Sequence, residues 1–430
     1  MRQLSATPFI VIMLILSVGS GEAQDRTDRF SDPYLATVTT AILNADRLGP
    51  RVKREVVHVP GLPGRNEVPG LEGRGNLSIA FYRQDHPAPL VFILAGLGSN
   101  PYFGLATYYA NLFHREGWHV VILPSPVTWN FALAASRTGA PGYAPQDARD
   151  LYDVMQRILA ALRTRHAVAT TRIDFLGASL GALEGAYLSV IDAEEGRIGI
   201  GKYLLINPPI DLEYALARVD DWHALAAKVG KERGKAIVAK ALDIVDSFSK
   251  DRRDDSAIFD AVARDFARFT REELQFLIAE DLQASLPELV YVTQIIQGQA
   301  SRPAGGKDEI RRRLQETTDM TLARYLDEIA LPVWRLQAAE PQADLHRFLQ
   351  GGSLAAVLPR LRGNPRVHVM HNADDPLVDR RSIQDLKEAL GDQMTLYANG
   401  GHLGNAWHPA HRELVLSFFG PAGVVTRPRS

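Results

Sequence analysis

The chain has 430 residues, 46% of them hydrophobic, and its 48 lysine and arginine residues nearly balance its 50 aspartate and glutamate residues. This apolar content suffices for a packed core and excludes a globally disordered chain, while the formal net charge of −2 argues against a nucleic-acid-binding protein with a large cationic surface. Because the chain contains no cysteine, disulfide frameworks, zinc fingers, iron–sulfur clusters and thiol nucleophiles are excluded.

The first predicted element is an apolar run over residues 8–18, followed by a small-residue stretch that ends at Ala23. The run is too short to span a bilayer comfortably, but it matches the apolar region of a secretory signal peptide. The small residues after it fit cleavage after Ala23. We therefore expect residues 1–23 to be a signal peptide and the mature protein to be exported, either periplasmic or secreted. An uncleaved membrane anchor is the alternative.

Short apolar runs alternate with helical patterns between residues 50 and 210. The continuous apolar run 90–94 is typical of a strand that is buried on both faces of a parallel sheet. Strands separated by helices of this length predict βαβ units and an α/β fold with a doubly wound, mostly parallel sheet. The predicted strands are 56–59, 77–82, 90–94, 119–123, 173–176 and 203–206, and the predicted helices are 102–115, 146–163 and 180–191.

Strand-like runs nearly disappear between residues 211 and 360, where long charged amphipathic helices are predicted. Thr270 and Glu273 have the spacing of a capping box ahead of one of them. We expect one discontinuous core domain, formed by residues 24–210 and 361–430, with residues 211–360 inserted as a helical lid. The predicted lid helices are 222–250 and 274–299, and the second part of the core contains predicted strands at 367–370 and 395–397 and helices at 380–390 and 409–419.

A Gly-x-Ser-x-Gly motif, Gly177 to Gly181, lies between an apolar strand and a helix rich in small residues. This setting is that of a nucleophile elbow, in which a serine occupies a strained strand-to-helix turn and the glycines allow strand and helix to approach. The N-terminus of the helix offers free N–H groups where negative charge develops. We therefore predict that Ser179 is a nucleophile; a serine that merely caps the helix is the alternative.

A serine hydroxyl needs a base to act as a nucleophile, and the base needs an acid to orient it. Two adjacent aspartates follow the predicted strand 367–370. We favour Asp375 as the acid because the Pro-Leu-Val sequence after it anchors the turn, whereas Asp374 is expected to be a solvated or turn-capping neighbour. Asp211 is a further, less favoured alternative.

The predicted base is His402, which lies in a glycine-rich turn, Gly400–Gly404, just after the last predicted strand. The flanking glycines would let the imidazole reach over the sheet edge toward the serine. His408 and His411 also follow this strand and are kept as alternatives. His411 is expected to belong to the closing helix, and His408 precedes a proline.

Two backbone N–H groups are predicted to form an oxyanion hole. One is that of Leu180, directly after the nucleophile, and the other is that of Leu97, in the turn after strand 90–94. Gly96 and Gly98 allow this turn to be tight. A dinucleotide-binding motif is excluded here because Pro101 stands at the third glycine position.

These segments together resemble the α/β-hydrolase superfamily, most closely its esterase, lipase and serine-aminopeptidase branches. The resemblance covers about residues 56–210 and 361–420 and implies a Ser179–His402–Asp375 triad that works by acyl transfer, with no cofactor or metal. Ala95 departs from the histidine commonly found at the oxyanion turn. In this superfamily a helical lid after the sixth strand is common and sets substrate choice.

We therefore expect an exported serine hydrolase that cleaves an ester, thioester or amide of a small-molecule or lipid-like acyl substrate. No nucleic-acid partner and no stable membrane span after signal cleavage are expected. A hydrolase-fold binding protein without turnover and an acyltransferase with the same triad are the alternatives. Trp129 and Phe131, after strand 119–123, either line the acyl pocket or pack as ordinary loop residues.

Overall fold

The computed structural model describes residues 31–43, 48, 52–63, 65, 71–97, 99, 101–249, 251, 255–298, 312–317 and 320–421. The predicted signal peptide, residues 1–23, lies outside these ranges. Within them, no helix combines the length and apolar character that crossing a membrane would require.

Eight strands form one sheet in the order β1-β2-β4-β3-β5-β6-β7-β8. The pairs β1–β2 and β2–β4 are antiparallel, and all other neighbours are parallel. The prediction of a mostly parallel, doubly wound α/β sheet is confirmed. The strands are β1 (Glu55–Val59), β2 (Leu77–Tyr82), β3 (Ala88–Leu94), β4 (His119–Ile122), β5 (Thr170–Ala178), β6 (Tyr203–Ile206), β7 (Val367–Asn372) and β8 (Met394–Tyr397).

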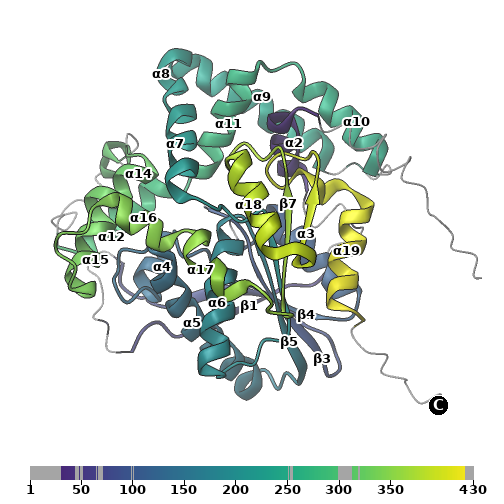
Figure 1. Ribbon diagram of the computed structural model, residues 1–430, viewed down its shortest axis with the longest axis vertical. Coiled ribbons are helices and arrows are strands. Elements are labelled where there is room, and N and C mark those ends of the chain that lie inside the picture. The colour runs from purple at the N-terminus through teal and green to yellow at the C-terminus, as the bar shows by residue number, and fades with distance from the viewer. Residues whose placement is uncertain are drawn as a thin grey trace, which may run out of the picture.

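Helices cover both faces of the sheet, so that β3, β4 and β6 are buried along their whole length (Figure 1). Successive side chains of β3 point to opposite faces: Phe92 joins one core cluster and Ile93 the other. The first face is covered by α5 (Ala144–Arg165), α6 (Leu180–Glu195), α17 (Leu354–Leu361) and α18 (Arg380–Leu390), and the second by α3 (Gly104–Arg115) and α19 (Pro409–Phe419).

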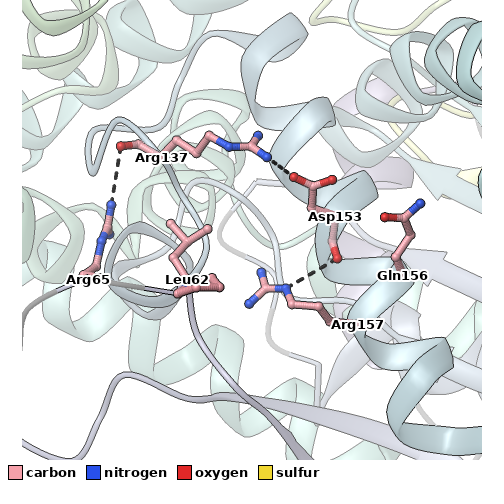
Figure 2. Close-up of a pocket in the computed structure, with 7 residues that line it drawn as sticks. Leu62, Arg65, Arg137, Asp153, Gln156 and Arg157 are labelled. Atoms are coloured by element: carbon pink, nitrogen blue, oxygen red, sulfur yellow. Dashed lines mark hydrogen bonds and ion pairs between the residues drawn. The ribbon is translucent and has the colours of Figure 1, made fainter.

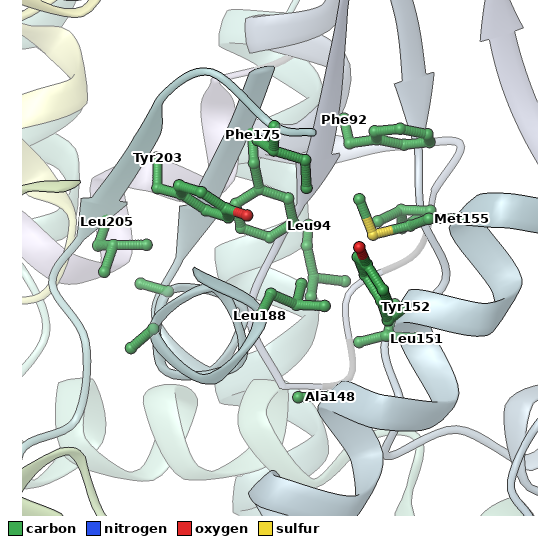
Figure 3. Packing of buried hydrophobic residues seen from close by; sticks show 14 of the residues in the cluster. Phe92, Leu94, Ala148, Leu151, Tyr152, Met155, Phe175, Leu188, Tyr203 and Leu205 are labelled. Atoms are coloured by element: carbon green, nitrogen blue, oxygen red, sulfur yellow. The ribbon is translucent and has the colours of Figure 1, made fainter. Parts of the chain in front are cut away.

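The core under α5 and α6 is built from large side chains fitted around small ones (Figure 3). The ring of Phe175 on β5 lies beside that of Tyr203 on β6, with centroids 5.9 Å apart. A Cβ atom added to Gly185 on α6 would lie 2.5 Å from the Phe175 ring. The glycine therefore allows α6 to lie close against β5, which fixes the start of the helix relative to the strand.

Between β6 and β7 the described residues form helices and no strand. The last of these helices, α17, packs on α6 and contributes Leu354, Val357 and Leu361 to the core beneath the sheet. The others are seen at the top and left of Figure 1, and some of them contribute side chains to the second core cluster. They are α7 (Leu212–His223), α8 (Leu225–Val229), α9 (Lys231–Ser249), α10 (Asp255–Phe266), α11 (Arg271–Gln283), α12 (Leu286–Ile296), α14 (Leu322–Tyr325), a π-helical turn η4 (Leu326–Ala330), α15 (Leu331–Ala338) and α16 (Leu345–Gly352).

The two long helices predicted in this segment are wrong in their extent. The predicted helix 222–250 is broken at Gly230, whose φ of 78° no right-handed helix accommodates. The predicted helix 274–299 is interrupted after Gln283, because Pro287 occupies the first turn of a new helix and cannot lie in a helix interior. The capping box is confirmed, with Thr270 and Glu273 exchanging side-chain hydrogen bonds of 3.2 and 3.0 Å.

Several short elements were not predicted. α4 (Trp129–Ala134) follows β4 where a loop was expected, and α2 (Pro33–Thr39), with the short helix η2 (Thr40–Ile42), packs against the second face of the core. Two further short helices, η5 (Gly391–Gln393) and η6 (Gly404–Trp407), flank β8 and its following turn. α2 contacts η6 and so brings the N-terminal part of the described chain to the turn that carries His402.

Candidate active site

Ser179 lies in a sharp turn between β5 and α6, with φ 55° and ψ −125°. A non-glycine residue in this region of backbone space is strained and needs support from its surroundings. The Ser179 N–H donates to the Ile206 carbonyl at 2.8 Å, which ties the turn to β6. A Cβ atom added to Gly177 would lie 2.2 Å from the carbonyl oxygen of Gly181. A Cβ atom added to Gly181 would lie 2.1 Å from the carbonyl oxygen of Leu94. Only glycines therefore allow this close approach of β5, α6 and the end of β3.

Three side chains from turns after β5, β7 and β8 form a hydrogen-bonded chain. His402 Nε2 lies 2.8 Å from Ser179 Oγ, and His402 Nδ1 lies 2.9 Å from Asp375 Oδ2. All three residues are buried, with Ser179 7% exposed. Because an ionised carboxylate can only accept, Nδ1 carries the imidazole proton and Nε2 accepts from the serine hydroxyl. This arrangement is chemically able to withdraw the serine proton.

The carboxylate of Asp375 is held by three donors. In addition to His402, Asn207 Nδ2 donates to Oδ2 at 2.8 Å, and the Leu377 N–H donates to Oδ1 at 3.0 Å. Burial acts to raise the pKa of Asp375, but the electrostatic attraction and hydrogen bond of His402, with the Leu377 N–H, outweigh burial and hold the pKa below its ordinary value. Asp375 is therefore ionised at neutral pH, which suits an acid that orients a histidine.

The neighbouring Asp374 binds backbone groups of the histidine turn, whereas Asp375 binds the His402 ring. Its two carboxylate oxygens accept the N–H groups of Gly400 and Gly401, at 3.2 and 2.9 Å. It thus holds the histidine turn in place instead of touching the histidine side chain. Asp211, the less favoured alternative, caps α7 and accepts from the Glu213 N–H at 2.9 Å.

The two alternative histidines lie away from Ser179. His408 caps the N-terminus of α19 through Nδ1, which accepts from the Ala410 N–H. His411 is buried within α19, 3.0 Å from the Tyr109 hydroxyl, and burial lowers its pKa to about 3. Of the three histidines, the structure brings only His402 into hydrogen-bond contact with Ser179.

The two predicted oxyanion donors belong to Leu180, directly after Ser179, and to Leu97, directly after Gly96 in the turn that follows β3. Gly96 touches Ser179: a Cβ added to Gly96 would lie 3.2 Å from Ser179 Oγ. Neither the Leu97 N–H nor the Leu180 N–H has a hydrogen-bond acceptor in the described ranges of the chain. The side chains of both leucines pack against one apolar cluster, which is formed mainly by the inserted elements α12, η4 and α16. Both N–H groups are therefore available to a ligand.

Two residues of this site were missed by sequence reasoning. Asn207 directly follows β6 with a φ of 48° and donates to Asp375; its position at the end of a buried strand, before two prolines, is the signal that could have identified it. Thr37 on α2 accepts the His402 N–H through Oγ1 at 2.9 Å and donates the same hydroxyl to the Pro33 carbonyl. No local pattern connects Thr37 to His402, because they lie 365 positions apart in the chain.

The two aromatic residues after β4 have separate roles. Phe131 is fully buried in the core under α5. Trp129 lines a cavity of about 710 Å³ that also touches Ser99 beside the predicted oxyanion turn. One residue therefore packs and the other faces a space that a ligand could fill.

A second cavity, of about 620 Å³, is lined by the arginine residues 65, 137 and 157 together with Asp153 on α5 (Figure 2). Arg65 donates to the carbonyls of Ala132 and Leu133, and Arg137 pairs with Asp153. Ser179, His402 and Asp375 are not among its described lining residues. Its polar groups brace the segment before β2 against α4 and α5.

Comparisons with known proteins match no protein-family model and no curated protein. Among solved structures, a brefeldin A esterase, described as a bacterial homologue of human hormone-sensitive lipase, is 14% identical, with 90% of this chain and 84% of that chain covered and a TM-score of 0.41. A thioesterase domain from the curacin biosynthetic pathway is 12% identical, with coverages of 85% and 100% and a TM-score of 0.38. An esterase from Pyrococcus furiosus is 11% identical, with coverages of 86% and 92% and a TM-score of 0.38.

These likenesses are distant, and the fold is assigned from the sheet itself. Its strand order, β1-β2-β4-β3-β5-β6-β7-β8, places the serine turn after the central strand β5. The turns with Asp375 and His402 follow the last two strands, in the chain order of serine, acid and histidine. The chain therefore has the α/β-hydrolase fold.

Proposed function

We propose that this protein is a serine hydrolase that cleaves an ester, thioester or amide of an acyl substrate through an acyl-enzyme intermediate. The observation that carries the proposal is the hydrogen-bonded chain from Ser179 through His402 to Asp375. The geometry matches the requirement that a nucleophile lie within hydrogen-bond reach of its base, and the base within reach of an orienting group.

In the first step, Ser179 Oγ attacks the substrate carbonyl carbon while His402 Nε2 takes the hydroxyl proton. The resulting oxyanion accepts hydrogen bonds from the N–H groups of Leu97 and Leu180. The intermediate then expels the leaving group, which receives the proton from His402, and an acyl-serine remains. Water attacks this acyl-serine with His402 again acting as the base, and the acid is released as Ser179 is regenerated. Asp375 stabilises the imidazolium that forms in each step.

The experiment is a substrate panel of p-nitrophenyl esters, thioesters and aminoacyl amides of increasing acyl length. Wild type is compared with Ser179→Ala and with Ser417→Ala, which removes an exposed hydroxyl on α19. We expect hydrolysis of at least one class by wild type and by Ser417→Ala, and a loss of about 10⁴-fold or more in Ser179→Ala. Equal activity of Ser179→Ala and wild type would overturn the assignment of the nucleophile.

We also propose that the protein is exported, on the strength of the apolar run 8–18 and the small residues up to Ala23. Expression of the full chain, followed by fractionation and N-terminal sequencing, tests this. Export with cleavage gives a mature chain that starts at Gln24. A chain that starts at Met1 and stays with the membrane would instead support the anchor.

A further inference from the structure

The 710 Å³ cavity includes part of the turn after β3, and Gly96 of this turn lies against the candidate nucleophile. Ser99 forms part of its wall, and the Ser99 N–H donates to the Gly96 carbonyl at 3.2 Å. A Cβ added to that same Gly96 would lie 3.2 Å from Ser179 Oγ. A substrate with its carbonyl at Ser179 could therefore extend one of its two halves into this cavity.

From there the cavity follows the carboxyl edge of the sheet. Trp129 and Asn130 lie at the start of α4, just after β4. Because β2 runs antiparallel to β4 and β1 antiparallel to β2, Ser78 near the start of β2 and His58 near the end of β1 lie at this same edge. Open α/β sheets bind ligands in the crevice outside the carboxyl ends of their strands, which is where this cavity lies.

The lining combines polar side chains with aromatic ones and with Pro101, whereas cavities that hold small molecules are usually lined mostly by apolar side chains, including aliphatic ones. Of the described residues that line it, none is Leu, Ile, Val, Met or Phe. A hydrocarbon chain in this space would remove water from these polar groups without replacing its hydrogen bonds, which costs free energy. An acyl chain is therefore a poor occupant, and a group rich in hydrogen-bonding atoms is a good one.

Several polar groups of the lining are available to a ligand. Within the described ranges, the side chains of Arg74, Asn76, Ser99 and Glu288 make no hydrogen bond. Arg74 precedes β2 and Glu288 lies in the first turn of α12, so the two walls bring one positive and one negative group to the same cavity. Their charges offset each other, which favours an uncharged ligand over an anion or a cation.

We propose that this cavity binds an uncharged, polyhydroxylated group, so that the substrates of the hydrolase are sugar esters whose carbohydrate half lies here. The hydrolysis of a sugar ester rests on the function proposed above, whereas binding of the sugar does not. Hydroxyl groups both donate and accept, as the amide, hydroxyl, carboxylate and guanidinium groups of the lining require. The half-buried indole of Trp129 supplies an apolar face for the C–H surface of a sugar ring.

The test separates binding from catalysis. Ligand-observed saturation-transfer NMR on the full protein is run with a panel of methyl hexosides, with cyclohexylmethanol as the ring without hydroxyls, and with free amino acids as zwitterions. Glu288→Ala and Asn76→Ala remove two groups of the lining, and Glu272→Ala removes an exposed carboxylate on α11 as the matched control. Circular dichroism establishes that each variant is folded.

We expect saturation transfer to at least one methyl hexoside, at least tenfold weaker binding in a folded Glu288→Ala or Asn76→Ala variant, and unchanged binding in Glu272→Ala. No transfer to any hexoside, stronger transfer to cyclohexylmethanol or to the amino acids, or equal binding by both lining variants and wild type would each overturn the proposal. Because the measurement needs no turnover, hexoside binding without ester hydrolysis would contradict the proposed function alone.

A second measurement addresses substrate choice. The kcat/KM of a 6-O-acyl methyl glucoside is compared with that of the cyclohexylmethyl ester of the same acid. We expect wild type to prefer the sugar ester by at least tenfold, and Glu288→Ala to reduce this ratio. Hydrolysis of the cyclohexylmethyl ester at an equal or greater rate would contradict the sugar subsite while leaving the serine hydrolase proposal intact.

Discussion

The charge on Asp375 determines what His402 can do. With three donors around the carboxylate and its pKa below the ordinary value, Asp375 is ionised and holds the Nδ1 proton of His402. The opposite ring nitrogen then faces Ser179 as an acceptor. The identity of the acid was predicted from its position in the turn, but the amide donor Asn207 was not, because side-chain contacts between separate strand ends follow from the folded sheet.

Replacing Asp375 by asparagine tests this charge. We expect Asp375→Asn to lower kcat by about 10³- to 10⁴-fold, because an amide can donate to Nδ1 and favour the tautomer in which Nε2 cannot accept from Ser179. Steady-state kinetics on an ester that wild type hydrolyses provides the measurement. A matched Asp374→Asn variant, which alters the contacts to Gly400 and Gly401 but not the histidine ring, is expected to lose less activity. Equal losses would contradict the separate roles of the two aspartates.

A second carboxyl group lies on α6, the helix that follows Ser179. Glu184 on α6 is 1% exposed, and its Oε2 atom has no hydrogen-bond partner among the described residues. Burial, and then repulsion from Asp147 and Asp150, raises the pKa of Glu184 well above its ordinary value. The folded protein therefore holds the Glu184 proton more tightly than the unfolded chain does. Between the pKa of Glu184 in the unfolded chain and its higher pKa in the folded protein, the free energy of unfolding falls as the pH rises.

We therefore predict that Glu184→Gln increases stability relative to wild type more strongly at pH 8 than at pH 5. The difference between the two free energies of unfolding can grow by up to about 1.4 kcal/mol per pH unit, the value for one proton. Urea unfolding across this pH range measures it, with Glu272→Gln, on the exposed surface of α11, as the control. A difference that stays constant or shrinks with rising pH would contradict a raised pKa at Glu184.

At the scale of elements, the turns that carry Ser179 and His402 were predictable from the sequence. The helix α2, which supports the His402 turn, was not. The glycines around Ser179 mark a close approach of β5, α6 and β3, and the structure shows the backbone contacts that require them. The glycine turn of His402 was also visible in the sequence. Its support by α2 was not, because a seven-residue helix carries little periodic signal and acts through a contact between chain segments far apart in sequence.

Thr37 is expected to act as a positioning residue. Thr37→Val removes the acceptor of the His402 N–H and the donor to the Pro33 carbonyl at nearly constant volume. We expect kcat to fall about fivefold with KM nearly unchanged, because loss of the hydrogen bond to the His402 N–H, of about 1 kcal/mol, displaces the histidine but not the substrate.

The control for this prediction is Thr37→Ser, which keeps the hydroxyl and should restore most of the lost kcat. Thermal unfolding of both variants distinguishes misplacement of His402 from loss of the fold. Equal kcat values for Thr37→Val and wild type would show that α2 does not position the histidine.

At the scale of the whole molecule, the sequence indicated one α/β sheet interrupted by a long helical segment. The apolar runs were sufficient to locate all eight strands approximately, and the signal was continuous in the strands buried on both faces, such as β3. The helical segment was harder to divide. Its breaks depend on single residues such as Gly230 and Pro287, and amphipathic patterns continue across them. The cavity that this helical segment helps to line depends on tertiary packing, which cannot be predicted from local sequence patterns.

The core between the sheet and the helices α5 and α6 gives a prediction for stability. Phe175 packs on Tyr203 and Gly185 beneath the nucleophile turn (Figure 3). We expect Phe175→Ala to reduce the free energy of unfolding by about 3–5 kcal/mol, through loss of apolar contacts and the cavity left behind. Denaturant unfolding measures this loss, and Phe103→Ala, at an exposed phenylalanine, is the matched control with little expected change. A loss below about 1 kcal/mol would contradict the tight packing described for this layer.

The central claim is that Ser179 is an activated nucleophile, and covalent labelling by a fluorophosphonate tests it most directly. Intact mass spectrometry and peptide mapping are applied to wild type, Ser179→Ala and Ser417→Ala after reaction with the probe. We expect one adduct per chain on Ser179 in wild type and in Ser417→Ala, and none in Ser179→Ala. Labelling of Ser179→Ala as strong as that of wild type, or no labelling of the wild-type protein, would contradict it.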